Sequence, residues 1–172
     1  MKKTSHEITP DHQERAVLVS LVTQELKREE TYDPDYSLAE LIRLAETANV
    51  EVLGTMTQNK EYADSKWFIG KGKAQELKEL LEEKDANTAI FDQELSGAQV
   101  RNLEQFLDVK IIDRTQLILD IFAGRAKTRE GIIQVELAQL SYLLPRLSGH
   151  GKNLSRLGGG IGTRGPGESK LE

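Results

Sequence analysis

Apolar residues in the first two thirds of the chain gather into short runs, separated by segments with helical periodicity. Four runs rich in β-branched residues are typical of buried strands, at 15–22, 50–58, 88–92 and 109–113. Between them, leucine and alanine recur at spacings of three and four, which predicts helices that begin near Ser37, Gly70 and Ser96. The alternation predicts an α/β subdomain over residues 15–112, a small parallel β-sheet with flanking helices.

Polar residues mark where these predicted helices begin. Ser37 with Glu40, and Ser96 with Gln99, fit the capping-box pattern, in which a serine and an acid or amide three residues later satisfy free backbone N–H groups. A short run before the Gly70 helix, WFIG at 67–70, resembles a further strand. We therefore expect these helices to start at Ser37, Gly70 and Ser96.

The pattern changes at Asp113, where helical periodicity continues as far as Leu147 without a proline before Pro145. We expect one long helix over 113–147, roughly 50 Å in length at 1.5 Å per residue. Gly124 and Gly131 each cost about 1 kcal/mol relative to alanine, so the pattern also allows a bend or break near them.

The second half of this predicted helix carries an apolar seam. Its members step by four and three residues: Ile133, Leu137, Leu140, Leu144 and Leu147. Such spacing is typical of a helix that packs along another helix. Pro166 and Glu168 suit a first helical turn, so we expect residues 166–172 to begin the return arm of an antiparallel hairpin that the chain truncates. An exposed seam would then cause artefactual self-association of this fragment.

Composition narrows the class of protein. The 172 residues include no cysteine, which excludes disulfides and thiolate metal sites and favours a reducing, cytoplasmic location. Two of the three histidines lie in residues 1–14, so we expect no metal site. Residues 1–14 lack the apolar stretch of a secretory signal and read as a disordered leader. No apolar run approaches the roughly 18–20 residues that span a bilayer.

Charge is distributed unevenly along the chain. The net charge is −5, yet residues 125–172 contain eight Lys and Arg against four Glu, a net of +4, and the remainder carries −9. An acidic body with a basic end suggests a polyanionic partner for the basic end. Chance clustering of charge is the alternative.

The strongest local signal is a glycine-rich basic loop at 148–165, together with Arg146 just before it. Its polar and basic residues are Arg146, His150, Lys152, Asn153, Arg156 and Arg164, and its glycines are Gly149, Gly151, Gly158, Gly159, Gly160, Gly162 and Gly165, with Gly167 following. Glycine permits close backbone approach to a crowded surface, and basic side chains neutralise phosphate. Because the loop has no aromatic residue, we expect backbone and phosphate contacts with RNA rather than base stacking. A flexible linker is the alternative.

Arg125 and Arg129, one turn apart on the predicted long helix, would extend this basic face, or else form an ordinary solvated face. Gly160, Gly162 and Gly165 match GxGxxG, but no strand precedes them, which argues against dinucleotide binding.

A second candidate site lies at Gly70, Lys71, Gly72 and Lys73. These residues follow a strand-like run and open a helix, so free N–H groups and two lysines could hold an anion or nucleotide. A glycine turn with solvated lysines is the alternative. Asp92 and Glu94 at a strand end are explained equally well by the dipole of the following helix, and we find no catalytic constellation.

Several segments together resemble the N-terminal part of HflX-type ribosome-associated GTPases, over about residues 15–172. They are WFIGKGK, TAIFDQELSGAQVRNLE, VKIIDRTQLILDIFAGRAKTREGIIQVELAQLSYLLPRL and RLGGGIGTRGPGESKLE, of which the GGGIGTRGPGE run is the most specific. The resemblance implies an α/β subdomain followed by a helical hairpin. It also implies a translation factor that binds the large ribosomal subunit and is linked to ribosome splitting or rescue under stress.

In this family, the loop between the hairpin helices approaches the peptidyl-transferase region of ribosomal RNA, and it maps onto Arg146–Arg164 here. GTP and Mg²⁺ belong to a G domain that follows the hairpin. The chain ends at Glu172 with no GxxxxGK[ST], NKxD or DxxG motif, so we expect neither GTPase activity nor a cofactor in it. The expected partners are ribosomal RNA and that G domain. Two alternatives stay open: a nucleotide-binding domain using Gly70–Lys73, and a protein-interaction module using the apolar seam.

Overall fold

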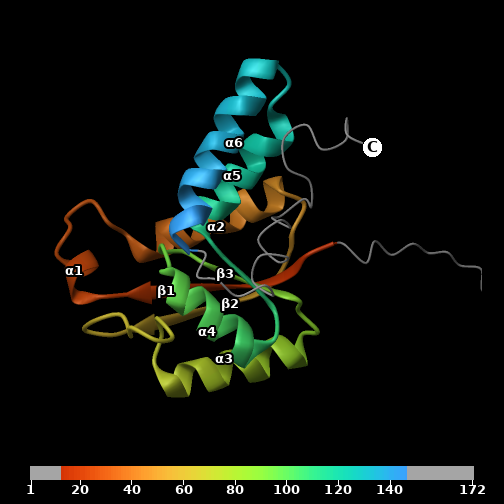
Figure 1. Ribbon diagram of the computed structural model, residues 1–172. Coiled ribbons are helices and arrows are strands. Elements are labelled where there is room, and N and C mark those ends of the chain that lie inside the picture. The colour runs from red at the N-terminus through yellow and green to blue at the C-terminus, as the bar shows by residue number, and fades with distance from the viewer. Residues whose placement is uncertain (1–12, 147–172) are drawn as a thin grey trace, which may run out of the picture.

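The computed structural model describes residues 13–146 and contains a four-stranded parallel sheet (Figure 1). The strands lie in the order β2-β1-β3-β4. Their bounds are β1 Arg15–Val22, β2 Glu51–Asn59, β3 Thr88–Phe91 and β4 Lys110–Asp113. The predicted parallel α/β fold is confirmed.

Helices cover both faces of this sheet and continue beyond it (Figure 1). Their bounds are α1 Gln24–Lys27, α2 Pro34–Thr47, α3 Lys71–Glu83, α4 Gly97–Leu107, α5 Arg114–Arg125 and α6 Arg129–Leu143, with a 3₁₀ turn at Leu144–Arg146. Helices α3 and α4 lie on one face, and α2 and the start of α5 on the other. Residues 1–12 of the predicted leader, the glycine-rich loop and the return arm lie outside the described residues. The predicted leader is wrong at its last residue, because Glu14 is buried and pairs with Lys110.

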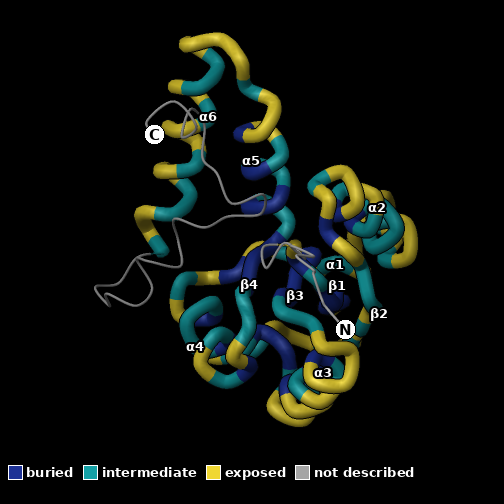
Figure 2. The backbone as a smooth tube through the Cα atoms, turned by 90° about the vertical axis from the view of Figure 1, so that its right-hand side faces the viewer, coloured by how far each residue is buried: buried dark blue, intermediate teal, exposed yellow. Residues whose placement is uncertain are grey.

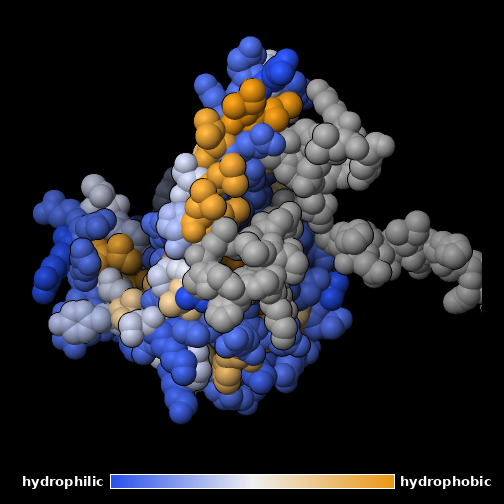
Figure 3. Space-filling model, viewed as in Figure 1, coloured by the Kyte–Doolittle hydropathy of each residue, from blue (hydrophilic) through white to orange (hydrophobic). Residues whose placement is uncertain are grey.

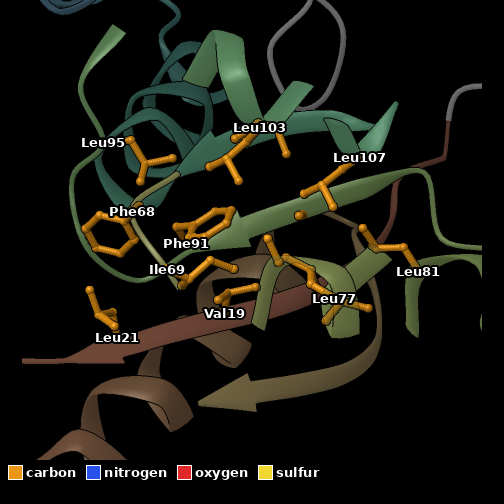
Figure 4. Close-up of a cluster of buried hydrophobic side chains, with 14 residues drawn as sticks. Val19, Leu21, Phe68, Ile69, Leu77, Leu81, Phe91, Leu95, Leu103 and Leu107 are labelled. Atoms are coloured by element: carbon orange, nitrogen blue, oxygen red, sulfur yellow. The ribbon is translucent and has the colours of Figure 1, made fainter. Parts of the chain in front are cut away.

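Two apolar cores result from the alternation of side chains along the central strands. On the α3–α4 side, Val19 and Phe91 pack with Leu77 and Leu103 (Figure 4). Successive residues of a strand point to opposite faces, so Leu18, next to Val19, packs into the core beneath α2. Burial on both faces explains why β1 reads as an unbroken apolar run.

Two of the predicted helix starts are confirmed. Ser96 and Gln99 form the complete capping box of α4. Helix α3 begins at Lys71 with Gly70 as its N-cap.

The predicted start of α2 at Ser37 is wrong. Helix α2 begins three residues earlier, because Asp33 accepts hydrogen bonds from first-turn amides and Pro34 suits the first helical position. The predicted strand at 67–70 is also not formed, and only an isolated bridge joins Asp64 to Phe68.

The single long helix predicted over 113–147 is wrong as well. Helix α5 ends at Arg125, Ala126 is extended, and Thr128 caps α6 by accepting a hydrogen bond from the Gly131 amide. Helix α6 then returns alongside α5 (Figure 1). The break falls between the two glycines of this region, and residues 114–143 form an antiparallel hairpin by themselves.

The outer face of α6 is apolar and open to solvent (Figures 2 and 3). Ile133, Leu137, Leu140 and Leu144 keep between 48% and 59% of their surface exposed. These four residues are the described part of the predicted seam, since Leu147 lies outside the described residues. Helix α6 therefore packs on α5 through a different face and leaves the seam accessible.

Buried and exposed leucines of two helices provide a matched stability test. Leu77→Ala in α3 should lower the free energy of unfolding by about 2–5 kcal/mol, because it opens a cavity in a packed core. Leu137→Ala in α6 changes the same residue type in a helix and should cost about 0.5 kcal/mol or less. Urea denaturation measures both values, and equal losses would show that the seam is buried.

Candidate functional site

Two buried carboxylates lie at the carboxyl edge of the sheet. Asp92 directly follows β3, and Asp113 ends β4, whose last residue pairs with Phe91. Neighbouring parallel strands end at the same edge, which brings the two acids close to the helices that follow. These acids organise the contacts between the sheet and the helical hairpin.

Asp92 forms an ion pair with Arg114, the first residue of α5. Arg114 Nη1 lies 2.7 Å from Asp92 Oδ1, and the Ser37 hydroxyl donates to Asp92 Oδ2 at 2.7 Å. Arg114 also pairs with Glu40. The two residues expected to cap α2 therefore hold Arg114 instead, and the cluster joins α2, β3 and α5.

Asp113 accepts hydrogen bonds from three further elements. Its carboxylate accepts from the amides of Leu95 and Gln116, each at 3.0 Å, and from the Tyr142 hydroxyl near the end of α6. Burial and the neighbouring Asp113 carboxylate raise the pKa of the Tyr142 hydroxyl well above its ordinary value. The Tyr142 hydroxyl consequently remains protonated, and keeps donating to Asp113, at alkaline pH values where an ordinary tyrosine ionises.

Arg146, predicted as an RNA contact, lies against the protein. Its guanidinium donates to the carbonyls of Leu95 (3.1 Å) and Tyr142 (2.7 Å), pairs with Glu94 at 2.6 Å, and lies 3.6 Å from the centre of the Tyr142 ring. The other predicted contacts in the loop lie outside the described residues: His150, Lys152, Asn153, Arg156 and Arg164, with glycines Gly158, Gly159, Gly160, Gly162, Gly165 and Gly167.

Arg125 and Arg129 occupy the tip of the α5–α6 hairpin. The prediction that they lie one turn apart on one helix is wrong, because Arg125 ends α5 and Arg129 begins α6. Both are exposed, as is Lys127 between them. Within residues 13–146, none of the three has a carboxylate oxygen within 4.0 Å. This basic tip, defined as Arg125, Lys127 and Arg129, stands away from the sheet (Figure 1).

The start of α3 has some features of an anion site. No side chain caps its first N–H groups, and no acidic residue occupies its first turn. However, Gly70 donates its amide to Gln58 at 2.9 Å, and Lys73 pairs with Glu76 at 3.6 Å. Anion binding at Gly70–Lys73 therefore stays a prediction.

Sequence reasoning did not single out Arg114 or Tyr142, whose partners lie far along the chain. An acid as the last residue of each of two predicted strands, 88–92 and 109–113, was the available signal for Asp92 and Asp113. Over residues 13–146, no group of three or more His, Cys, Asp or Glu side chains is arranged to hold a metal ion. That part of the chain also contains no helix long and apolar enough to cross a membrane.

Comparison with known proteins identifies the family. The model of the GTP-binding GTPase N-terminal family matches residues 35–123, and that of the GTP-binding GTPase Middle Region matches 125–172. GTPase HflX of Alkalihalophilus pseudofirmus is 58% identical over 154 residues, which cover 90% of this chain and 36% of that protein. The chain belongs to the HflX family of GTPases.

Other relatives agree with this assignment. GTPase HflX of Escherichia coli K12 is 46% identical over 163 residues, which cover 94% of this chain and 37% of that protein. A crystal structure of a GTP-binding protein from Sulfolobus solfataricus in complex with GDP is 27% identical, with a TM-score of 0.55, and the match covers 83% of this chain and 40% of that one. The chain thus spans little more than a third of the curated relatives it matches, and the matched regions are the N-terminal and middle ones.

The contact between Tyr142 and Asp113 predicts how stability depends on pH. A tyrosine whose pKa is raised in the folded state stabilises the fold fully below the ordinary value of 10.0, and this stabilisation is lost as pH rises above it. Between about pH 9 and about pH 11, the unfolding free energy of the unmodified chain should therefore fall more steeply than that of Tyr142→Phe.

Urea titrations of both proteins at each pH measure this difference. Tyr62→Phe is the control, because Tyr62 is 72% exposed and should follow the unmodified chain. Parallel pH profiles for Tyr142→Phe and the unmodified chain would contradict the assigned hydrogen bond.

Proposed function

We propose that this chain is a ribosomal RNA-binding module, which attaches an HflX-type GTPase to the large ribosomal subunit for ribosome splitting or rescue. The observation that most strongly supports this proposal is the separation of charge along the chain. Residues 125–172 have a net charge of +4, and the other residues have a net charge of −9. The described cations of this basic end are Arg125, Lys127 and Arg129 at the hairpin tip and Arg146, of which Arg146 is paired with Glu94. The acidic body would be repelled by RNA phosphate, which orients the module with the basic end toward RNA.

The anchoring of the hairpin supports this proposal. Asp92 with Arg114, and Asp113 with Tyr142, fix both helices to the edge of the sheet. A rigidly mounted support lowers the entropy lost when the basic segment binds, so more of the interaction energy appears as affinity. In this proposal GTP and Mg²⁺ act in a G domain of the full-length protein and time the release.

Removing charge from the glycine-rich segment tests the proposed function. Lys152→Ala, Arg156→Ala and Arg164→Ala combined should weaken binding to purified large subunits and reduce the slope of log K against log salt by roughly two to three. Pelleting of the chain with large subunits across a salt series measures both quantities.

The matched control removes three cations from the acidic body, Lys27→Ala, Arg28→Ala and Lys84→Ala, all at exposed positions. This variant should keep the salt slope of the unmodified chain. Equal effects of the two triple variants, or no binding by the unmodified chain, would contradict the proposal.

The exposed seam favours a second candidate function, a protein-interaction surface on α6. Four large apolar side chains, about half exposed, follow one face of the helix (Figure 3). Apolar patches of this kind are typical of helix–helix contacts. At high concentration, a second copy of the chain is the simplest occupant.

Sedimentation velocity tests this second function. The unmodified chain should associate reversibly as its concentration rises, and Leu137→Gln with Leu140→Gln should remain monomeric. Arg43→Gln with Glu46→Gln, on the exposed surface of α2, serves as a control that should still associate. A monomeric unmodified chain at every concentration would argue against self-association.

A further inference from the structure

Arg146 connects the end of α6 to the segment between β3 and α4. We propose that Arg146 is a positioning residue, a latch that fixes the direction in which the chain enters the glycine-rich segment, and not an RNA ligand. Its effect on ribosome binding rests on the proposed function, whereas the latch itself is a property of the fold.

The side chain of Arg146 makes its contacts within the protein. Nε donates to the Leu95 carbonyl, Nη1 to the Tyr142 carbonyl and Nη2 to the Glu94 carboxylate. Only 16% of the surface of the Arg146 side chain is exposed. The planar guanidinium also stacks on the Tyr142 ring. Three of the five guanidinium N–H groups thus bond within the protein, and the Glu94 carboxylate beside them repels phosphate, so Arg146 is poorly placed to bind RNA.

The backbone of Arg146 is held as closely as its side chain. Arg101 Nη1 donates to the Arg146 carbonyl at 3.3 Å. Gly97, the first residue of α4, lies so near that a Cβ there would be 2.8 Å from this carbonyl oxygen and 2.9 Å from the Arg146 Cα. Only glycine permits this approach, so position 97 is part of the latch.

These contacts close into a ring. Leu95 donates its amide to Asp113 and accepts from Arg146 through its carbonyl. Asp113 accepts from Tyr142, whose ring and carbonyl contact Arg146. The ring joins β4, the β3–α4 segment and both ends of the hairpin. Residue 146 is therefore fixed relative to the sheet, and the basic segment starts from a defined point.

Substitution of Glu94 distinguishes the two possible roles of Arg146, because a latch and an RNA ligand predict opposite changes in binding to large subunits. If Arg146 bound phosphate, Glu94→Gln would free the arginine, remove a repelling charge and strengthen binding to large subunits. If Arg146 is a latch, the same change loosens it and weakens binding roughly three- to tenfold, the size expected when a segment must be ordered on binding. The slope of log K against log salt also distinguishes the two roles. Arg146→Ala should leave this slope unchanged if Arg146 is a latch, whereas loss of a phosphate contact would lower it by about one.

Gly97→Ala provides an independent variant that leaves every charge in place. It should weaken binding to a similar extent, because the added Cβ displaces residue 146. The control is Gly54→Ala in β2, where an added Cβ meets nothing within 4 Å. Stronger binding by Glu94→Gln, or unweakened binding by Gly97→Ala, would overturn the latch.

Hydrogen exchange tests the latch without the ribosome. In Arg146→Ala, and also in Arg146→Lys because lysine lacks the fork of donors, the amides of 93–97 and 142–146 should exchange faster than in the unmodified chain. Unchanged exchange in Arg146→Ala would overturn the latch even if binding were lost. If the unmodified chain fails to bind large subunits, the proposed function fails, and exchange alone still decides the latch.

Discussion

The carboxylate of Asp113 is the group on which the arrangement of the helical hairpin depends. A buried carboxylate is costly unless its oxygens accept hydrogen bonds, and here they accept from the amides of Leu95 and Gln116 and from the Tyr142 hydroxyl. These donors come from the β3–α4 segment, α5 and α6. One acid at the end of β4 therefore fixes the start of the hairpin, its return and the neighbouring loop together, and moving any of them leaves a buried charge undersolvated.

The α/β half could be predicted from sequence because its signals are local. Central strands buried on both faces appear as continuous apolar runs, and Ser96 with Gln99 formed the expected cap. The break between α5 and α6 was allowed by Gly124 and Gly131, but its position could not be predicted in the same way. Residues on both sides favour a helix, and only the extended backbone at Ala126 and the cap at Thr128 separate them. Ser37 was misread because Asp33 and Pro34 supply a stronger start, which frees Ser37 to bind Asp92.

Charge and glycine content are properties of composition, so the basic and glycine-rich character of residues 125–172 could be read directly from the sequence. The role of Arg146 could not. Its partners Glu94 and Leu95 lie about fifty positions earlier in the chain, and only the fold brings them within hydrogen-bonding distance. A pattern of basic residues cannot separate an arginine paired with a carboxylate from one available to phosphate. The two cases can be told apart only when the contacts of each arginine in the folded structure are known.

The same distinction explains how an acidic domain can present a basic end. In the body, Arg15 pairs with Asp85, Lys110 with Glu14, and Arg114 with Asp92, so much of its positive charge is balanced locally. Arg125, Lys127 and Arg129 lie beyond these acids at the hairpin tip and are exposed. Unbalanced positive charge is thereby placed at the far end of two helices, while most of the acidic residues remain on the body. The ion pairs at the base of the hairpin consequently serve two purposes, since they hold the helices in place and leave the unbalanced positive charge at the hairpin tip.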